Sequence, residues 1–116
     1  MTVRRVVPNL PTRSVAESRD FYGALGLAEV MDLGWIATLA SPSAPAAQLS
    51  LFPDGDLTAP VVPDLSVEVD DVDAVHAALR ERGAEIVHPL RDEEWGVRRF
   101  FVRDPDGRVV NVLGHR

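Results

Sequence analysis

The segment around Trp95 holds the clearest candidate chemistry in the sequence. Three acidic residues, Asp92–Glu94, come directly before Trp95, and Gly96 follows it. A flat indole ring beside carboxylates suits a ligand that is both aromatic and cationic, because the ring face and the charges attract the same guest. A solvated acidic loop, with a tryptophan packed in the core or in a dimer interface, explains the same residues without a ligand. We therefore treat Trp95 and Glu94 as candidate ligand-binding residues.

The other reactive residue types form no familiar catalytic pattern. The sequence has no cysteine, so it offers neither a thiolate metal ligand nor a cysteine nucleophile. Its three histidines, His76, His88 and His115, lack the spacing of two ligands to one ion. It contains neither a Ser–His–Asp pattern nor a glycine-rich phosphate loop. We interpret each histidine as a surface or structural residue, and we expect no metal and no cofactor.

Length and composition are typical of one globular domain. The chain has 116 residues, of which 46% are hydrophobic and 26% charged. A net charge of −6 repels phosphate backbones, so nucleic acid is not an expected partner. No apolar run approaches the roughly 20 residues that span a bilayer, and the first residues lack the apolar core of a signal peptide. We expect a single cytoplasmic domain over residues 1–116 with no membrane partner.

The first half of the sequence predicts a strand, a helix and three short strands. A valine-rich strand is expected over residues 4–10. Ser14 and Glu17 match a capping box, so a helix is expected from residue 15 to about residue 25, with Gly26 ending it. The apolar stripe of this helix comprises Val15, Phe21, Tyr22 and Leu25. The three short strands are expected over residues 28–31, 35–40 and 48–52.

The second half predicts the same series of elements. After a strand over residues 65–69, Asp71 can cap a helix over residues 72–82, which Gly83 ends. The apolar face of this helix comprises Val72, Val75, Ala78 and Leu79, with His76 on its polar side. Three strands follow, over residues 84–87, 98–103 and 108–113, the last two joined by an Asp-Pro-Asp-Gly turn.

An internal repeat relates the two halves. An offset of 57 residues separates Val15 from Val72 (72 − 15) and Gly26 from Gly83 (83 − 26). Each half therefore corresponds to a βαβββ module, the first over about residues 1–56 and the second over about residues 64–116. A module of this size buries its own sheet face poorly. The sequence predicts an α+β fold in which the modules form a concave sheet, although two ordinary strand–helix units would give the same spacing by coincidence.

Three stretches of the sequence carry a family resemblance. They are VPNLPTRSV at residues 7–15, SRDFYGALGL at residues 18–27, and WGVRRFFVRDPDG at residues 95–107. With the duplicated βαβββ pattern, they resemble the vicinal oxygen chelate superfamily, which includes glyoxalases, bleomycin-resistance proteins and extradiol dioxygenases. The opening and ending motifs are most similar to the bleomycin-resistance type. The resemblance implies a mixed, concave sheet completed by homodimerisation, and the valine-rich segment at residues 3–7 would suit exchange of the first strand between subunits.

The resemblance also implies where a metal would bind. Metalloenzymes of the superfamily hold one divalent ion through His, Gln or Glu side chains. The matching positions in this sequence are Val7, Ser50, Asp64 and Asn111. Valine has no donor atom, and serine and asparagine are weak ligands for first-row metals. The resemblance is therefore to a member without the metal ligands and without the glyoxalase, dioxygenase or metal-dependent thiol-transferase activities.

Without a metal, the concave sheet becomes an apolar groove with a few polar groups, which is typical of a small-molecule site. In similar resistance proteins, aromatic side chains sandwich the planar rings of the drug. A carboxylate in such a groove has a raised pKa and can act as an acid or base, so Asp64, facing Asn111, is a candidate catalytic residue. The favoured interpretation is that Asp64 simply begins a strand in contact with water. The candidate ligand-binding residues are Trp95, Trp35, Glu94, Phe52, Phe101, Ser50 and Asn111, and core filling is the alternative for both phenylalanines.

Three functions remain open from the sequence. The favoured one is a metal-independent protein that binds a small molecule and sequesters an aromatic or cationic antibiotic without chemistry. The second is a metal-independent isomerase, cyclase or lyase that uses Asp64 as its acid or base. The third is a non-catalytic sensor or partner domain. The sequence does not identify the ligand or the pathway.

Overall fold

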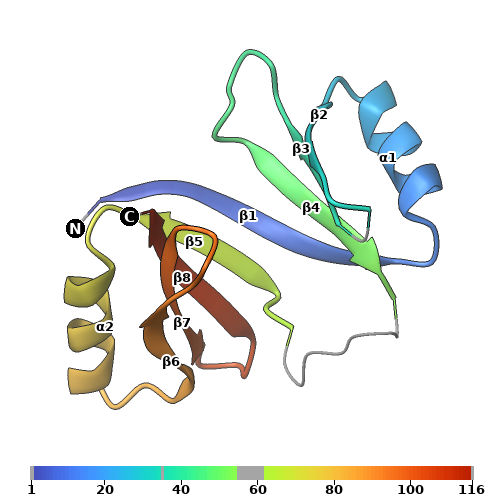
Figure 1. Cartoon of the computed structure of the whole chain (residues 1–116). Coiled ribbons are helices and arrows are strands. Elements are labelled where there is room, and N and C mark those ends of the chain that lie inside the picture. Colours follow the sequence, from blue (N-terminus) through green and yellow to red (C-terminus); the bar gives the residue numbers. More distant parts are fainter. Residues whose placement is uncertain (1, 35, 55–61, 116) are drawn as a thin grey trace. The chain divides into compact units, whose positions relative to one another are not determined.

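The computed structural model describes residues 2–34, 36–54 and 62–115 of the chain, and Trp35 lies outside this part. Within it, two helices and eight strands alternate as two βαβββ series, so the predicted α+β class is confirmed (Figure 1). The first series consists of β1 (Val3–Thr12), α1 (Val15–Ala24), β2 (Ala28–Asp32), β3 (Ala37–Ala40) and β4 (Gln48–Pro53). The second consists of β5 (Leu65–Val69), α2 (Val72–Glu81), β6 (Ile86–Asp92), β7 (Val97–Arg103) and β8 (Val109–His115).

The chain divides into two compact units. The first unit is Val7–Val62, and the second is Met1–Val6 with Pro63–Arg116. In the first unit the strand order is β2-β3-β4-β1, with β4 antiparallel to β3 and parallel to β1. In the second unit the strands run in the order β1-β5-β8-β7-β6, with β5 and β8 parallel and β7 antiparallel to both of its neighbours. Strand β1 thus contributes its start to the second unit and its end to the first.

Both helices begin and end at the predicted residues to within one position. The Ser14 hydroxyl accepts a hydrogen bond from the Glu17 backbone N–H at 3.1 Å, and the Asp71 carboxylate accepts one from the Ala74 N–H at 3.0 Å. These side chains satisfy N–H groups that have no partner within the helix. Neither helix in the described part of the chain is long and apolar enough to cross a membrane.

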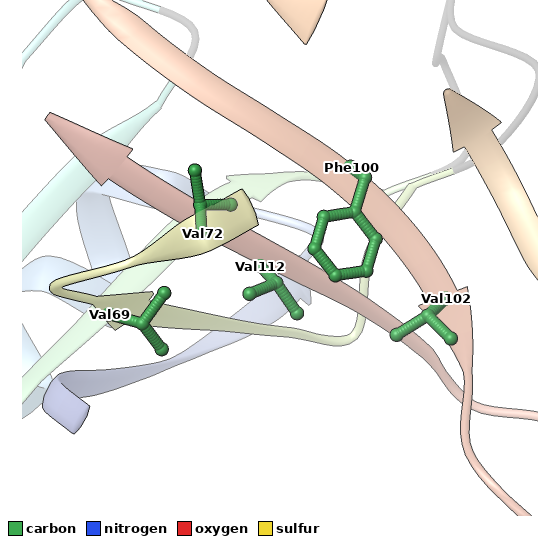
Figure 2. Close-up of a cluster of buried hydrophobic side chains, with 5 residues drawn as sticks. All are labelled: Val69, Val72, Phe100, Val102 and Val112. Atoms are coloured by element: carbon green, nitrogen blue, oxygen red, sulfur yellow. The ribbon is translucent and has the colours of Figure 1, made fainter. Parts of the chain in front are cut away.

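The core of the second unit lies between α2 and one face of the sheet. Side chains alternate along each strand, so one face of β5, β7 and β8 is almost wholly apolar. The α2 residues Val75 and Leu79 pack against this face, as predicted. The fully buried centre, shown in Figure 2, comprises Val69, Val72, Phe100, Val102 and Val112.

The apolar stripe predicted for α1 is not buried. Helix α1 contacts β2, β3 and β4, but none of its residues is buried. Phe21 and Leu25 are 62% and 67% exposed. These two positions are four residues apart and share one side of the helix. That side faces solvent within the first unit, so the part of the apolar stripe formed by these two residues does not contribute to the unit's core.

Two further predictions in the second unit need correction. His76 does not lie on a polar side of α2, because its ring packs edge-on against Phe100 with centroids 4.8 Å apart. Strand β6 is longer than the predicted residues 84–87, so His88 lies inside a strand rather than near its end. Pro89 is compatible with this position because β6 is the last strand of the sheet, where a missing N–H leaves no neighbour unpaired.

Candidate ligand-binding site

The sheet face opposite α2 in the second unit carries a row of polar and aromatic side chains. Strand register places Ser66 of β5 beside Asn111 of β8, and Asn111 beside Phe101 of β7. Phe101 in turn lies beside His88 of β6. Because Phe100 points into the core, the adjacent Phe101 points to the opposite side. We call this side the open face, and it includes the groups that contact these four residues.

Trp95 stands on a short turn between β6 and β7. The Gly96 N–H donates to the Glu93 carbonyl at 3.2 Å, and the Glu93 N–H donates to the Val97 carbonyl at 2.6 Å. Gly96 has a φ of 85°, a left-handed conformation that favours glycine over residues with a side chain. The turn leaves Trp95 63% exposed, so its indole ring does not fill the core.

Arg99 joins Trp95 to the open face. Its guanidinium carbon lies 5.1 Å from the centroid of the Trp95 ring and 4.9 Å from that of Phe101. Both distances are within the range of a cation–π interaction. Phe101 itself is buried. The arrangement is therefore an aromatic platform with one exposed ring, one buried ring and an arginine against both.

Glu93 is the buried charge of the open face. One of its carboxylate oxygens, Oε1, accepts from Arg91 Nε at 3.0 Å and from Arg99 Nε at 3.3 Å. Burial by itself raises the pKa of this carboxyl, but the hydrogen bonds and charges of the two arginines outweigh burial and leave the pKa below its ordinary value. Glu93 is therefore ionised at neutral pH and holds both arginines in place.

The acidic run before Trp95 is mostly committed to arginines. Asp92 forms an ion pair with Arg98 at 3.2 Å, and Arg98 also pairs with Asp73 of α2 at 2.8 Å. Glu93 is engaged as described, and Glu94 is exposed. The sequence suggested that all three carboxylates before Trp95 attract a cationic ligand. In the structure, two of the three are instead paired with arginines.

His88 belongs to the open face and was missed as a candidate from the sequence. Its ring lies 4.8 Å from that of Phe101, and its Nε2 is 3.7 Å from Glu93 Oε1. Burial, then the positive charge of Arg99, lower the pKa of the imidazole, so it is neutral at pH 7. Its Nδ1 is buried and has no hydrogen-bond partner in the described part of the chain. No sequence signal marks His88, because only strand pairing brings it to Phe101.

Asn111 lies on the open face, opposite a different residue from the one expected. Its Nδ2 donates to Ser66 Oγ at 3.1 Å, and its Oδ1 is buried without a partner among the described residues. Asp64 lies two residues before Ser66 and does not face Asn111. Its exposed carboxylate accepts from the Val109 N–H at 2.9 Å, which caps the start of the β5–β8 pairing.

The remaining candidates lie in the first unit. Ser50 and Phe52 are both buried on β4, and the Ser50 hydroxyl is hydrogen-bonded to the Thr38 hydroxyl at 2.8 Å. Trp35 lies outside the described residues. The structure thus brings Trp95, Phe101 and Asn111 onto one sheet, whereas Ser50 and Phe52 stand on the sheet of the other unit.

Comparison with known families agrees with this fold. The model of the Glyoxalase/Bleomycin resistance protein/Dioxygenase superfamily matches residues 3–112. The chain belongs to this superfamily. No curated protein matches the chain at a significant level.

Solved structures of low sequence identity share the superfamily fold. A glyoxalase/bleomycin resistance protein/dioxygenase superfamily member from Vibrio splendidus 12B01 matches with a TM-score of 0.72 and 19% identity, covering 99% of this chain and 100% of that one. Methylmalonyl-CoA epimerase from Mycobacterium tuberculosis matches with a TM-score of 0.68 and 21% identity, covering 98% and 87%. A hypothetical protein from Bacillus halodurans C-125 matches with a TM-score of 0.76 and 15% identity, covering 100% and 96%.

The residues at the four positions where the resemblance implies a metal do not suit a divalent ion. Val7 is buried and has no donor atom. The Ser50 hydroxyl is bonded to Thr38, and the Asp64 carboxylate to the Val109 N–H. Asn111 supplies only a neutral amide. In the part of the chain that the structure describes, no group of three or more His, Asp or Glu side chains could hold a metal ion.

A hollow lies on the α2 side of the sheet. It has a volume of about 900 Å³, and its floor is formed by core residues such as Val75, Leu79 and Val110. The charged residues that line it include Arg82 and Arg103, and Arg103 is paired with Glu85. This hollow contains none of the candidate residues, whereas aromatic and polar side chains converge on the open face.

Proposed function

We propose that this chain binds a small planar aromatic molecule on the open face of the second unit and sequesters it without a metal. The observation that carries the proposal is the exposed Trp95 ring, held by a tight turn beside Arg99 and Phe101. An exposed indole ring beside a guanidinium and a buried phenyl ring offers a planar ligand a surface on which to stack. Stacking on such a ring needs no reacting group, so the protein could sequester its ligand by binding it without a chemical reaction.

The polar groups of the open face support the same proposal. His88 Nδ1 and Asn111 Oδ1 lie in one row on either side of Phe101, and neither has a partner among the described residues. A buried polar atom without a hydrogen bond costs about 1–3 kcal/mol. A small rearrangement that brings these atoms to a bound molecule or a water would recover part of this cost. An antibiotic is among the candidate ligands, because the matched superfamily includes bleomycin resistance proteins.

A metal-independent enzyme using the same face is the second candidate function. His88 favours it, because a neutral imidazole at pH 7 can accept a proton. Asp64 favours it less, since its exposed carboxylate is engaged by the Val109 N–H. Under this alternative, His88→Gln would abolish turnover of a bound metabolite while leaving its binding intact.

Binding is tested by fluorescence of Trp95 in a Trp35→Phe background, where Trp95 is the remaining tryptophan. We expect saturable quenching at one ligand per subunit by at least one member of a panel made up of metal-free bleomycin and planar aromatic antibiotics of either charge. When ligand binding is measured by equilibrium dialysis, Trp95→Ala should bind more weakly than the wild type by about 1–3 kcal/mol, the usual contribution of one aromatic stack. Trp95→Phe, which keeps a ring, should retain most of the affinity. A flat response across the panel would contradict the binding function.

We further propose that the chain forms a homodimer, as the superfamily resemblance implies. Four exposed apolar residues of the first unit support this: Phe21 and Leu25 on α1, Val30 on β2 and Leu33 after it. Sedimentation equilibrium should give twice the 12.7 kDa mass of the chain. The double variant Phe21→Ser, Leu25→Ser should weaken the dimer at least about 100-fold. Each large apolar side chain that is buried in the interface contributes about 1.5–3 kcal/mol to association, and the variant removes two of them. A monomeric wild-type chain at 100 μM would refute this proposal.

A further inference from the structure

We infer that the open face selects planar ligands that carry an anionic group, such as a carboxylate or sulfonate, and disfavours cationic ones. This inference rests on the proposed binding function and names its ligand class. It differs from the expectation that the acidic run before Trp95 attracts a cation. The reasons are the placement of Arg91 and Arg99 and the ion pairs that Asp92 and Glu93, two of the three carboxylates before Trp95, already form with arginines.

The hydrogen bonds of the two arginines leave most of their donors available. Both reach Glu93 through Nε alone. The terminal Nη1 and Nη2 groups of Arg91 and Arg99 have no hydrogen-bond partner among the residues that the structure describes. A guanidinium offers these groups as a planar fork that matches the two oxygens of a carboxylate. The open face therefore presents two charged forks beside its aromatic platform.

The same geometry works against a cation. Arg99 already lies over the rings of both Trp95 and Phe101, where a bound cation would seek the same negative ring faces. A cationic ligand stacked on Trp95 would stand close to this guanidinium and be repelled by it. Glu93 cannot compensate fully, because its buried carboxylate is already shared between two arginines.

Both arginine side chains are partly exposed to solvent. The side chain of Arg91 is 61% exposed and that of Arg99 is 24% exposed. A planar molecule on the exposed face or edge of Trp95 can direct an anionic substituent toward Arg99. Arg91 is the second arginine near this position, since both arginines donate to the same Glu93 oxygen. Since the chain as a whole carries a charge of −6, its long-range field does not attract anions. Selectivity must therefore come from these short-range contacts.

A matched pair of probes tests the inference, namely 1-naphthoate and 1-naphthylmethylammonium, which share a ring system and differ in the sign of their charge. Isothermal titration calorimetry of the full chain at pH 7.5 should show naphthoate binding at least about tenfold more tightly, the ratio expected from one charged hydrogen-bonded contact. Arg99→Gln should weaken naphthoate binding about tenfold and Arg99→Lys by less, because lysine keeps the charge without the fork. Raising the salt concentration to 1 M should reduce the preference.

The control is Arg103→Gln on the same strand, which removes the same charge from an arginine paired with Glu85, away from Trp95. It should leave naphthoate affinity within about twofold, and circular dichroism should show that all variants fold. Equal affinity for both probes, tighter binding of the ammonium, or unchanged naphthoate affinity in Arg99→Gln would overturn the anion preference while leaving binding itself in place. Failure of both probes and of the antibiotic panel would instead count against the proposed function.

Discussion

Replacing Phe100 with alanine is expected to lower the free energy of unfolding by about 3–5 kcal/mol, the usual cost of emptying a phenylalanine site in a packed core. Phe100 has 0% exposure and lies at the centre of the second unit's core with Val72 and Val112 (Figure 2). It also supports the His76 ring from α2. Its loss would therefore remove contacts between β7, β8 and the helix at once.

Urea denaturation followed by circular dichroism measures this loss. Phe100→Leu, which keeps most of the buried volume, should cost less than about 1.5 kcal/mol. Since domains of this size have only about 5–15 kcal/mol of stability, the alanine variant should be close to unfolding at 37 °C. A loss below about 1 kcal/mol would show that the second unit does not pack around this ring.

Replacing Glu93 with glutamine is expected to cost about 2 kcal/mol, because hydrogen bonds to charged groups typically contribute about 1.5–3 kcal/mol. The change keeps the size of the side chain and removes its charge, leaving Arg91 and Arg99 without their common anion. The cost stays below that of a fully buried ion pair, because Arg91 can turn toward water. The neighbouring Glu94→Gln is the matched control, and as an exposed residue it should change stability by less than about 0.5 kcal/mol.

The dependence of this loss on pH follows from the lowered pKa of Glu93. The folded chain binds the Glu93 proton more weakly than the unfolded chain does, so the carboxylate stabilises the fold fully above its ordinary pKa of 4.5. Its contribution disappears as the pH falls through the lower pKa of the folded state. The stability difference between wild type and Glu93→Gln should therefore be constant from pH 6 to 8 and shrink below about pH 4.5. A difference that grows toward acid pH would mean that the pKa is raised instead.

The order of elements could be predicted from the sequence because its signals are local. Ser14 and Asp71 cap helices through neighbours three residues away, and Gly26 and Gly83 supply the positive φ that ends them. The alternating valines of β5 and β8 likewise follow from one strand at a time. These local signals, repeated at the same spacing in both halves, were sufficient for the fold class. The family came from the resemblance carried by the three motif stretches at residues 7–15, 18–27 and 95–107.

The misplaced residues depended on contacts between elements. The apolar pattern of α1 resembles that of α2, yet Phe21 and Leu25 stay exposed because α1 packs on its strands through other residues. His88 lay just beyond the strand predicted over residues 84–87, but β6 continues through His88 and Pro89 because an edge strand tolerates a proline. Asn111 was expected to face Asp64, but its partner is Ser66, two residues further along. The register between β5 and β8, two strands distant in sequence, decides this pairing.

By itself, the sequence determined the βαβββ repeat, the helix ends and the superfamily, because each depends on residue identity and short-range spacing. That the chain works without a metal stays a prediction from the resemblance. Only the tertiary structure decided the chemistry of the open face. Strand pairing brings His88 and Asn111 to either side of Phe101, and side-chain packing places Arg99 over Trp95. Which carboxylates are already neutralised by arginines depends on distances between strands, and a linear pattern of charges does not contain those distances.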